Sequence, residues 1–212
     1  MTQSISELFE AQSSRTPSLP SILMRARPLL YAALNTSANQ IARYLLHRGA
    51  GPGVPIVVAL PRSFSHVAVM LGTWKIGAIV VPIDVTAGYD TLYLKAVLAD
   101  VDAMIVVTTG QFQSTLFATL PSIVLVLDRD MNFINSLDAS NVCMFDAKAG
   151  EEEGYPPAPP PLAAITYAYR RSGTVVGAPV THMNLLRRIL FFWRLFPMTH
   201  VAAMDDEESS DG

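Results

Sequence analysis

Hydrophobic positions along the chain alternate between two spacings. Short uninterrupted apolar runs, as in "PIVVAL", "AIVVPID", "AMIVVTT" and "SIVLVLD", have the length of strands buried on both faces. Apolar residues recur at helical spacing before and between these runs, over residues 33–48, 64–77, 90–100 and 110–120. Buried strands that alternate with amphipathic helices build parallel sheets of βαβ units. The pattern therefore predicts an α/β fold, a Rossmann-like parallel sheet flanked by helices.

Further elements are predicted on either side of this alternation. Residues 4–12 are expected to be helical, because Ser4 and Glu7 have the spacing of a capping box. The stretches "SILM" and "ARPLLY" are short strand candidates. Gly49 is expected to end the helix before it, and Ser63 to cap the start of the next one. Nearer the C-terminus, "LAAITYAY" is predicted as a strand and "THMNLLRRILFFWRLF" as a helix.

Some side chains and segments can be assigned before the fold is known. Trp74, Trp193 and the methionines are predicted to be core residues. Residues 147–161 are polar and proline-rich, as in a connector. Residues 201–212 are acidic and lack a hydrophobic pattern, so we expect one domain over residues 1–200 followed by a disordered tail. The helix over 90–100 is expected to bury its apolar positions, Leu92, Leu94, Val97 and Leu98.

Composition narrows the functional classes. Half of the residues, 50%, are apolar, which excludes a mostly disordered chain. The formal net charge is -3, so no basic field attracts nucleic acid or an anionic membrane. The single cysteine, Cys143, cannot form an internal disulfide, which fits a reducing compartment. No apolar run approaches the roughly 18 residues of a membrane span, and the first residues do not resemble a secretory signal. We therefore expect a cytoplasmic protein.

The segment "TYAYRRSGTVVGAPVTHMNLL", residues 166–186, is the strongest candidate for chemistry. Its pattern predicts a strand, a Gly-rich turn and then a helix, which is the setting of a phosphate-binding loop. Arg170 and Arg171 stand beside the turn, and no lysine lies between the glycines. Their guanidinium groups suit phosphate, or they are solvent-facing turn residues. The sequence leaves both interpretations open.

Other polar residues have simpler interpretations. Thr181 is predicted to N-cap the last helix, which favours a structural role for His182. His47, His66 and His200 show no metal-ligand spacing, and His66 is expected at the edge of the core. We predict no catalytic residue and no metal site in this chain.

Three segments, in order, carry a resemblance to a known family. "SISELFEAQSSRTPSLPSI" is similar to an opening helix followed by R-T-P-x-x-P-A. "LLYAALNTSANQIARYLLHRGAGPG" resembles the first core motif, L-T-Y-x-E-L, with its helix and terminal G-V-G-P-G. "VALPRSFSHVAVMLGTWKIGAIVVPID" resembles the second, L-K-A-G-x-A-Y-x-P-L-D. The chain looks like the front part of an adenylation domain of the nonribosomal peptide synthetase type, in the adenylate-forming (AMP-binding) superfamily. The resemblance extends over residues 4–196.

Residues 162–185 align without a gap with the third motif of that family, L-A-Y-x-x-Y-T-S-G-S-T-G-x-P-K-G continued by V-x-x-T-H-x-N-L. Arg170 stands at a family glycine, Tyr169 at a small hydroxyl residue and Val176 at the family's lysine. The matching positions are Leu162, Ala163, Tyr167, Gly173, Gly177, Val180, Thr181, His182, Asn184 and Leu185. In the family this loop covers the β- and γ-phosphates of ATP. The resemblance therefore implies a degenerate phosphate loop built from Arg170, Arg171, Ser172, Gly173, Thr174 and Gly177.

The resemblance also implies a reaction. Family members join ATP, accompanied by Mg²⁺, and a carboxylic acid, often an amino acid, into an acyl-adenylate. They then pass the acyl group to a phosphopantetheine thiol. The family's acyl pocket, adenine-binding strand and lysine-bearing C-terminal domain follow the third motif, so we expect a truncated, degenerate relative, a pseudoenzyme on its own. Two other hypotheses stay open: a non-catalytic interaction module or one half of a split domain, and nucleotide binding without turnover.

The last predicted helix adds a partner site to this interpretation. Residues 184–196 are apolar on nearly every side, which suits burial against several elements. We expect this helix to bind a synthetase partner or a split-domain remainder, or to self-associate. The side chains expected to make this contact are Phe191, Trp193 and Phe196.

Overall fold

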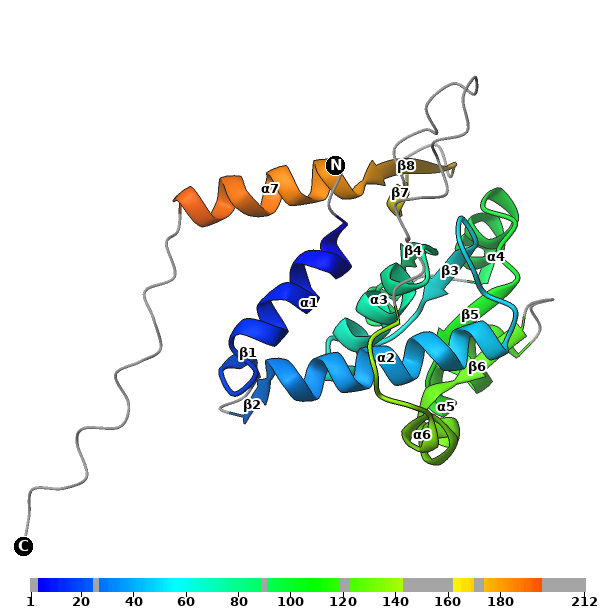
Figure 1. Ribbon diagram of the computed structural model, residues 1–212. Coiled ribbons are helices and arrows are strands. Elements are labelled where there is room, and N and C mark those ends of the chain that lie inside the picture. Colours follow the sequence, from blue (N-terminus) through cyan, green and yellow to red (C-terminus); the bar gives the residue numbers. More distant parts are fainter. Residues whose placement is uncertain are drawn as a thin grey trace, which may run out of the picture.

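The computed structural model describes residues 4–24, 27–88, 91–118, 123–142, 162–169 and 174–195. The proline-rich connector, Cys143, the loop residues 170–173 and the acidic tail lie outside these ranges. The described chain opens with a helix, an antiparallel hairpin and a longer helix (Figure 1), which are α1 (Ile5–Arg15), β1 (Pro20–Met24), β2 (Arg27–Leu30) and α2 (Tyr31–His47). The predicted capping box is confirmed, because the backbone N–H groups of Glu7 and Ser4 donate to each other's side chains.

A six-stranded sheet forms the centre of the fold, with the order β6-β5-β3-β4-β7-β8. The strands β3 (Pro55–Val58), β4 (Ile79–Pro82), β5 (Ile105–Thr108) and β6 (Ile123–Val126) are parallel, as their apolar runs predict. β7 (Leu162–Tyr169) continues the parallel arrangement beside β4. The elements that connect β3 to β6 are α3 (Phe64–Lys75), α4 (Thr91–Asp100), α5 (Gly110–Phe112) and the π-helix η1 (Gln113–Phe117).

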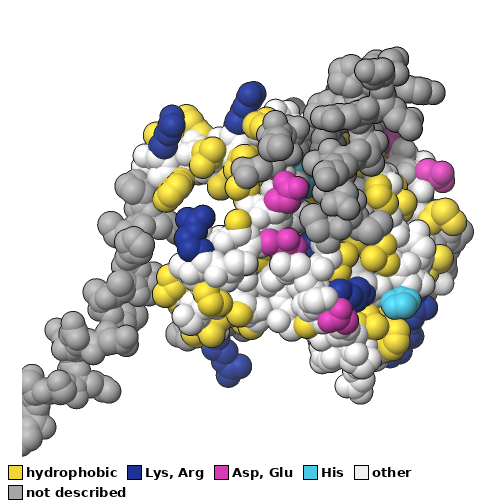
Figure 2. Space-filling view, in the orientation of Figure 1, with side chains coloured by type: hydrophobic (Ala, Val, Ile, Leu, Met, Phe, Trp, Pro, Cys, Tyr) yellow, Lys and Arg dark blue, Asp and Glu magenta, His cyan; other side chains and the backbone are white. Residues whose placement is uncertain are grey.

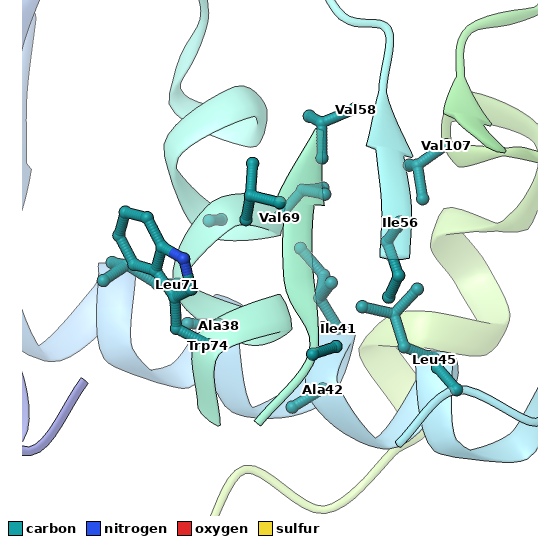
Figure 3. Packing of buried hydrophobic residues seen from close by; sticks show 14 of the residues in the cluster. Ala38, Ile41, Ala42, Leu45, Ile56, Val58, Val69, Leu71, Trp74 and Val107 are labelled. Atoms are coloured by element: carbon teal, nitrogen blue, oxygen red, sulfur yellow. The ribbon is translucent and has the colours of Figure 1, made fainter. Parts of the chain in front are cut away.

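Helices cover both faces of this sheet, because alternate strand residues point to opposite sides. Ile56 and Val58 pack with α2 and α3, whereas Val57 and Ala59 pack with α4 and η1. Figure 3 shows the first of these layers, where side chains of α2 and α3 converge on Ile56. The predicted parallel sheet flanked by helices is therefore confirmed.

The helices α2 and α3 approach each other closely at Gly72. A Cβ atom at this position would lie 2.9 Å from the carbonyl oxygen of Ala38 and 3.1 Å from the backbone nitrogen of Ala42. Backbone atoms cannot swing aside, so only glycine fits this crossing without a shift of one helix. Two residues further along α3, Trp74 is buried and its Nε1–H donates to the carbonyl oxygen of Ala163, 2.7 Å away, as expected for a core tryptophan.

Two assignments inside the alternating region were wrong. The helix α6 (Leu127–Ser136) begins directly after β6, where the sequence indicated only a strand. Leu92 is 74% exposed, and Tyr93 is buried in its place. The buried residues of α4 form pairs one turn apart, namely Tyr93, Leu94, Val97 and Leu98, and Leu92 falls outside that stripe.

The C-terminal part departs further from the prediction. Residues Val175–Thr181 form an additional strand, β8, which pairs antiparallel with β7. Gly177 and Pro179 weaken the strand pattern, but β8 is the last strand of the sheet, and proline is tolerated on an edge strand. Helix α7 (His182–Leu195) follows at once (Figure 1), and Trp193 on it is 61% exposed, contrary to its assignment to the core.

Candidate functional site

The candidate phosphate loop belongs to the turn of the β7–β8 hairpin. Its residues Arg170, Arg171, Ser172 and Gly173 lie outside the described residues, so their assignment remains a prediction. The last described pair below them is Tyr169 with Val175. Because β8 separates this turn from α7, the N-terminus of α7 lies at the opposite end of the strand. The expected strand–turn–helix arrangement is therefore wrong, because the whole of β8 lies in the chain between the turn and the N-terminus of α7.

Gly177, another predicted loop residue, has a packing role in the hairpin. It pairs with Tyr167 across the two strands. A Cβ atom on Gly177 would lie 3.0 to 3.1 Å from atoms at the end of the Tyr167 ring, which is closer than ordinary contact. The glycine therefore leaves room for the tyrosine to cross the neighbouring strand.

Tyr167 connects the hairpin to the helix on the same face of the sheet. Its hydroxyl donates to Oδ2 of Asp100 at the end of α4, 2.5 Å away. Burial, and then the contact with this carboxylate, raise the pKa of Tyr167 well above its usual value. The ring of Tyr169 also packs edge-on against Tyr93 of α4, with centroids 5.8 Å apart. These contacts hold the base of the loop against α4.

A pocket of about 320 Å³ lies beside Tyr167, at the ends of β3, β4 and β7. This is the carboxyl edge of the parallel strands, where open α/β sheets bind their ligands. Leu60, Pro82 and Ile83 form an apolar floor. The remaining lining residues bring a cation, a carboxylate, an imidazole and hydroxyl groups to one place, and they are Arg62, His66, Asp84, Tyr93, Thr166 and Tyr167.

Hydrogen bonds orient two of these polar groups. Nδ1 of His66 lies 3.1 Å from the carbonyl oxygen of Leu60. A carbonyl only accepts, so Nδ1 of His66 carries a proton and donates in this hydrogen bond. Asp84 accepts from both the backbone nitrogen and the hydroxyl of Thr86. These bonds, and more weakly the charges of Arg62 and His66, hold the pKa of Asp84 below its usual value.

The described groups of this pocket do not include a nucleophile paired with an activating base. None of the hydrogen bonds between described residues joins the His66 imidazole to a hydroxyl or thiol that it could activate. The sequence interpretation missed Arg62 and Asp84, although each lies within four residues after the end of a parallel strand. Their position after the strands could have indicated a shared site, since the carboxyl ends of parallel strands meet at one edge of the sheet. His66 is half-buried, as predicted for the edge of the core.

A triphosphate would need positive charge near the hairpin. The described strands β7 and β8 contain no lysine or arginine, and Val176, at the family's lysine position, is an apolar side chain that is 36% exposed. The described strands of the hairpin therefore offer no cation to the phosphates of ATP, and we derive no step through that cofactor. Among the same residues, no three His, Cys, Asp or Glu side chains are placed to hold a metal ion.

His182 has the structural role that the sequence favoured. Its side chain is buried, and its Nδ1 accepts from the backbone nitrogen of Ile5, 3.4 Å away. The ring also contacts Trp74, with centroids 6.0 Å apart. Burial lowers the pKa of His182 below its usual value, so the ring is held neutral. Thr181 accepts from the backbone nitrogen of Asn184, which confirms it as the N-cap of α7.

Comparison with known proteins decides the family. The profile of the AMP-binding enzyme family matches residues 9–209, nearly the whole chain. The chain belongs to the AMP-binding enzyme family. This family carries out adenylate-forming activation of carboxylates, generally with ATP and Mg²⁺. The resemblance of the three motifs to an adenylation domain is thereby confirmed. Separately, none of the described helices is long and apolar enough to cross a membrane.

Similar proteins include parts of large peptide synthetases. The chain is 33% identical over 190 residues to a linear gramicidin synthase of Brevibacillus parabrevis, which is 88% of this chain and 3% of that protein. It is 29% identical over 196 residues to a mycosubtilin synthase of Bacillus subtilis, which is 92% of this chain and 7% of that protein. The structure of VinN with L-aspartate shares the fold with a TM-score of 0.75 at 21% identity, covering 92% of this chain and 48% of VinN. This AMP-binding chain thus spans a small part of the synthetases and about half of VinN.

Proposed function

We propose that this chain is a degenerate adenylation-type subdomain that does not activate carboxylates on its own. The observation that carries the proposal is the chemistry of the β7–β8 hairpin. Val176 stands where the resemblance places the loop lysine, and the described strands β7 and β8 contain no lysine or arginine. Without that lysine, less positive charge is available to stabilise the negative charge that develops on the leaving pyrophosphate in the transition state.

Pyrophosphate exchange tests this proposal directly. The purified chain is incubated with ATP, Mg²⁺, labelled pyrophosphate and a panel of amino acids and aryl acids. We expect exchange no faster than in the control without protein. The Val176→Lys variant is expected to remain inactive, because the family's acyl and adenine sites follow the third motif. Exchange above the control by the unchanged chain, with any one carboxylate, would refute the proposal.

A second function, as a binding module or as one half of a split adenylation domain, is favoured by α7. Large apolar side chains on this helix are exposed, which is typical of a surface that binds a partner. The relatives are large multidomain synthetases, and that context also supports a synthetase partner. Nucleotide binding through Arg170 and Arg171 without turnover remains a weaker third candidate. Calorimetric titration of the chain with ATP and Mg²⁺ tests it, since the absence of binding heat excludes it.

A further inference from the structure

The pocket at the carboxyl edge of the sheet holds two opposite charges that do not pair with each other. Arg62 follows β3 and Asp84 follows β4, and both side chains line the pocket. Among the described residues, no ion pair joins the Arg62 guanidinium to the Asp84 carboxylate. The two groups are nevertheless close, because the charge of Arg62 contributes to the lowered pKa of Asp84. They therefore border a common space that is wider than a direct ion pair.

The topology of the sheet places this space between two strands whose connections diverge. The neighbouring strands β3 and β4 are parallel, and each is followed by a helix. The helix after β3 packs with Ile56 and Val58 on one face of the sheet, whereas the helix after β4 packs with Val57 and Val81 on the other. Connections that leave adjacent strands toward opposite faces open a crevice at the carboxyl ends, and open α/β sheets bind ligands in such crevices.

The carboxylate of Asp84 is fixed through one of its two oxygens. The backbone nitrogen and the hydroxyl of Thr86 both donate to Oδ1, at 2.9 and 2.6 Å. Among the described residues, no group donates to Oδ2, and the guanidinium of Arg62 donates to no acceptor. A fixed carboxylate oxygen suits an ammonium group, and a guanidinium suits the two oxygens of a second carboxylate. The pocket therefore offers one binding group for each sign of charge.

Apolar and aromatic side chains line the pocket beside these charges. Leu60, Pro82 and Ile83 form its floor, and Tyr93 and Tyr167 contribute rings. The volume of about 320 Å³ is at the lower end of the range for ligand pockets. These dimensions and this lining suit a short ligand that has methylene groups between two charged ends.

The charges on the rest of the molecule do not favour a ligand of either sign. The formal net charge of the chain is only -3. On the face that Figure 2 shows, dark blue Lys and Arg side chains and magenta Asp and Glu side chains are scattered, and neither kind forms a broad patch. Because no field of one sign surrounds the molecule on this face, the two local charges determine which small ligand binds. A ligand with one charge of each sign complements them.

We propose that this pocket binds a small zwitterion whose anionic group and ammonium group stand at opposite ends of a short methylene chain, as in an ω-amino carboxylate. Arg62 binds the anionic end, Oδ2 of Asp84 accepts from the ammonium end, and the apolar floor contacts the methylene groups. Neighbouring strands are about 4.8 Å apart, so groups that follow β3 and β4 fit two separated charges better than two charges on one carbon. This inference goes beyond the proposed function and holds whether or not the chain activates carboxylates.

Titration of the isotope-labelled chain with γ-aminobutyrate, followed by NMR of the backbone amides, tests the proposal. We expect saturable shifts of the amides in residues 60–66 and 82–86, with a Kd on the order of 1 mM, as is usual for so small a ligand. Butyrate and butylamine each lack one of the two charges. Each should bind about tenfold more weakly than γ-aminobutyrate, because one charge-assisted hydrogen bond is lost.

Two variants and two matched controls assign the ends of the ligand. Arg62→Gln should weaken γ-aminobutyrate binding about tenfold and leave butylamine binding unchanged. Asp84→Asn should have the same effect on γ-aminobutyrate and leave butyrate binding unchanged. The controls Arg27→Gln and Asp102→Asn make the same chemical changes at exposed positions outside the pocket, and they should bind γ-aminobutyrate like the unchanged chain. Arg62 and Asp84 are exposed as well, and the amide spectrum establishes that each variant is folded.

Several outcomes would overturn the proposal. One is the absence of saturable shifts in the unchanged chain at ligand concentrations up to about 20 mM, well above the expected Kd. Another is binding of butylamine or butyrate as tight as that of γ-aminobutyrate, which would mean that one of the two charges is not recognised. Equal weakening by a pocket variant and its control would exclude a local contact. Tighter binding of glycine than of γ-aminobutyrate would show that the two charges are not held at opposite ends.

Discussion

Replacement of Gly72 by alanine tests the packing of α2 against α3 most directly. The added Cβ atom would lie 2.9 Å from the carbonyl oxygen of Ala38, 3.0 Å from a methyl group of Ile41 and 3.1 Å from the backbone nitrogen of Ala42. Two of these three atoms belong to the backbone, so one helix must move by several tenths of an ångström. The strain falls on the layer that also holds Trp74 against β7.

The expected change in the free energy of unfolding combines two opposing effects. Overpacking of a well-packed core costs about 1–3 kcal/mol, and contact with backbone puts this site at the upper end. Alanine is a better helix former than glycine by about 1 kcal/mol, which offsets part of that cost. The net loss is therefore about 1–2 kcal/mol. For a chain of this size, each 1 kcal/mol corresponds to about 2–4 °C in Tm.

Thermal and urea unfolding of the unchanged chain and the Gly72→Ala variant measure this loss. Gly51→Ala is the matched control, because a Cβ atom at Gly51 meets nothing within 4 Å and its backbone does not adopt a positive φ. We expect the control to stay within about 0.5 kcal/mol of the unchanged chain. A Gly72→Ala variant as stable as the control would show that the two helices have room to separate, and the close-packing argument would fail.

Three other predictions follow from contacts near the hairpin and α7. Burial lowers the pKa of the His182 imidazole below 6.5, so the unfolded chain binds a proton at this ring more readily than the folded chain does. The stability that the neutral ring contributes is therefore present above about pH 6.5 and is lost as the pH falls below that value. Between about pH 7.5 and pH 5.5, the free energy of unfolding in urea should therefore fall more for the unchanged chain than for the His182→Gln variant. An equal fall for both chains would contradict this role of His182. Tyr167→Phe removes the hydrogen bond to Asp100 and should lower stability by about 1 kcal/mol in urea melts, with no effect if solvent replaces that bond. Gly177→Ala should destabilise the chain by about 1–2 kcal/mol, but much less in a Tyr167→Ala background; additive losses in this double-mutant cycle would exclude the contact between the added Cβ atom and the tyrosine ring.

Local sequence patterns were sufficient to predict the parallel strands, two helix caps and the family of this protein. The parallel strands β3 to β6 could be recognised because strands buried on both faces are apolar throughout. This apolar run is needed whichever helices cover the sheet. The capping box of Ser4 and Glu7 and the cap at Thr181 involve residues three apart, so they too were readable from the sequence. The order of the three motifs indicated the family before any fold was known.

Tertiary structure decided what depends on distant partners. β8 exists because β7 supplies its hydrogen bonds, which compensates for a glycine and a proline in its own sequence. Gly72 is required because α2 packs against it, and Arg62 and Asp84 line one pocket because two strands end at one edge of the sheet. On α7 the same apolar composition is buried at its first turn and exposed at its last. The hydrophobicity of a side chain predicts that its burial is favourable, but the surrounding fold decides whether a surface is present to bury it.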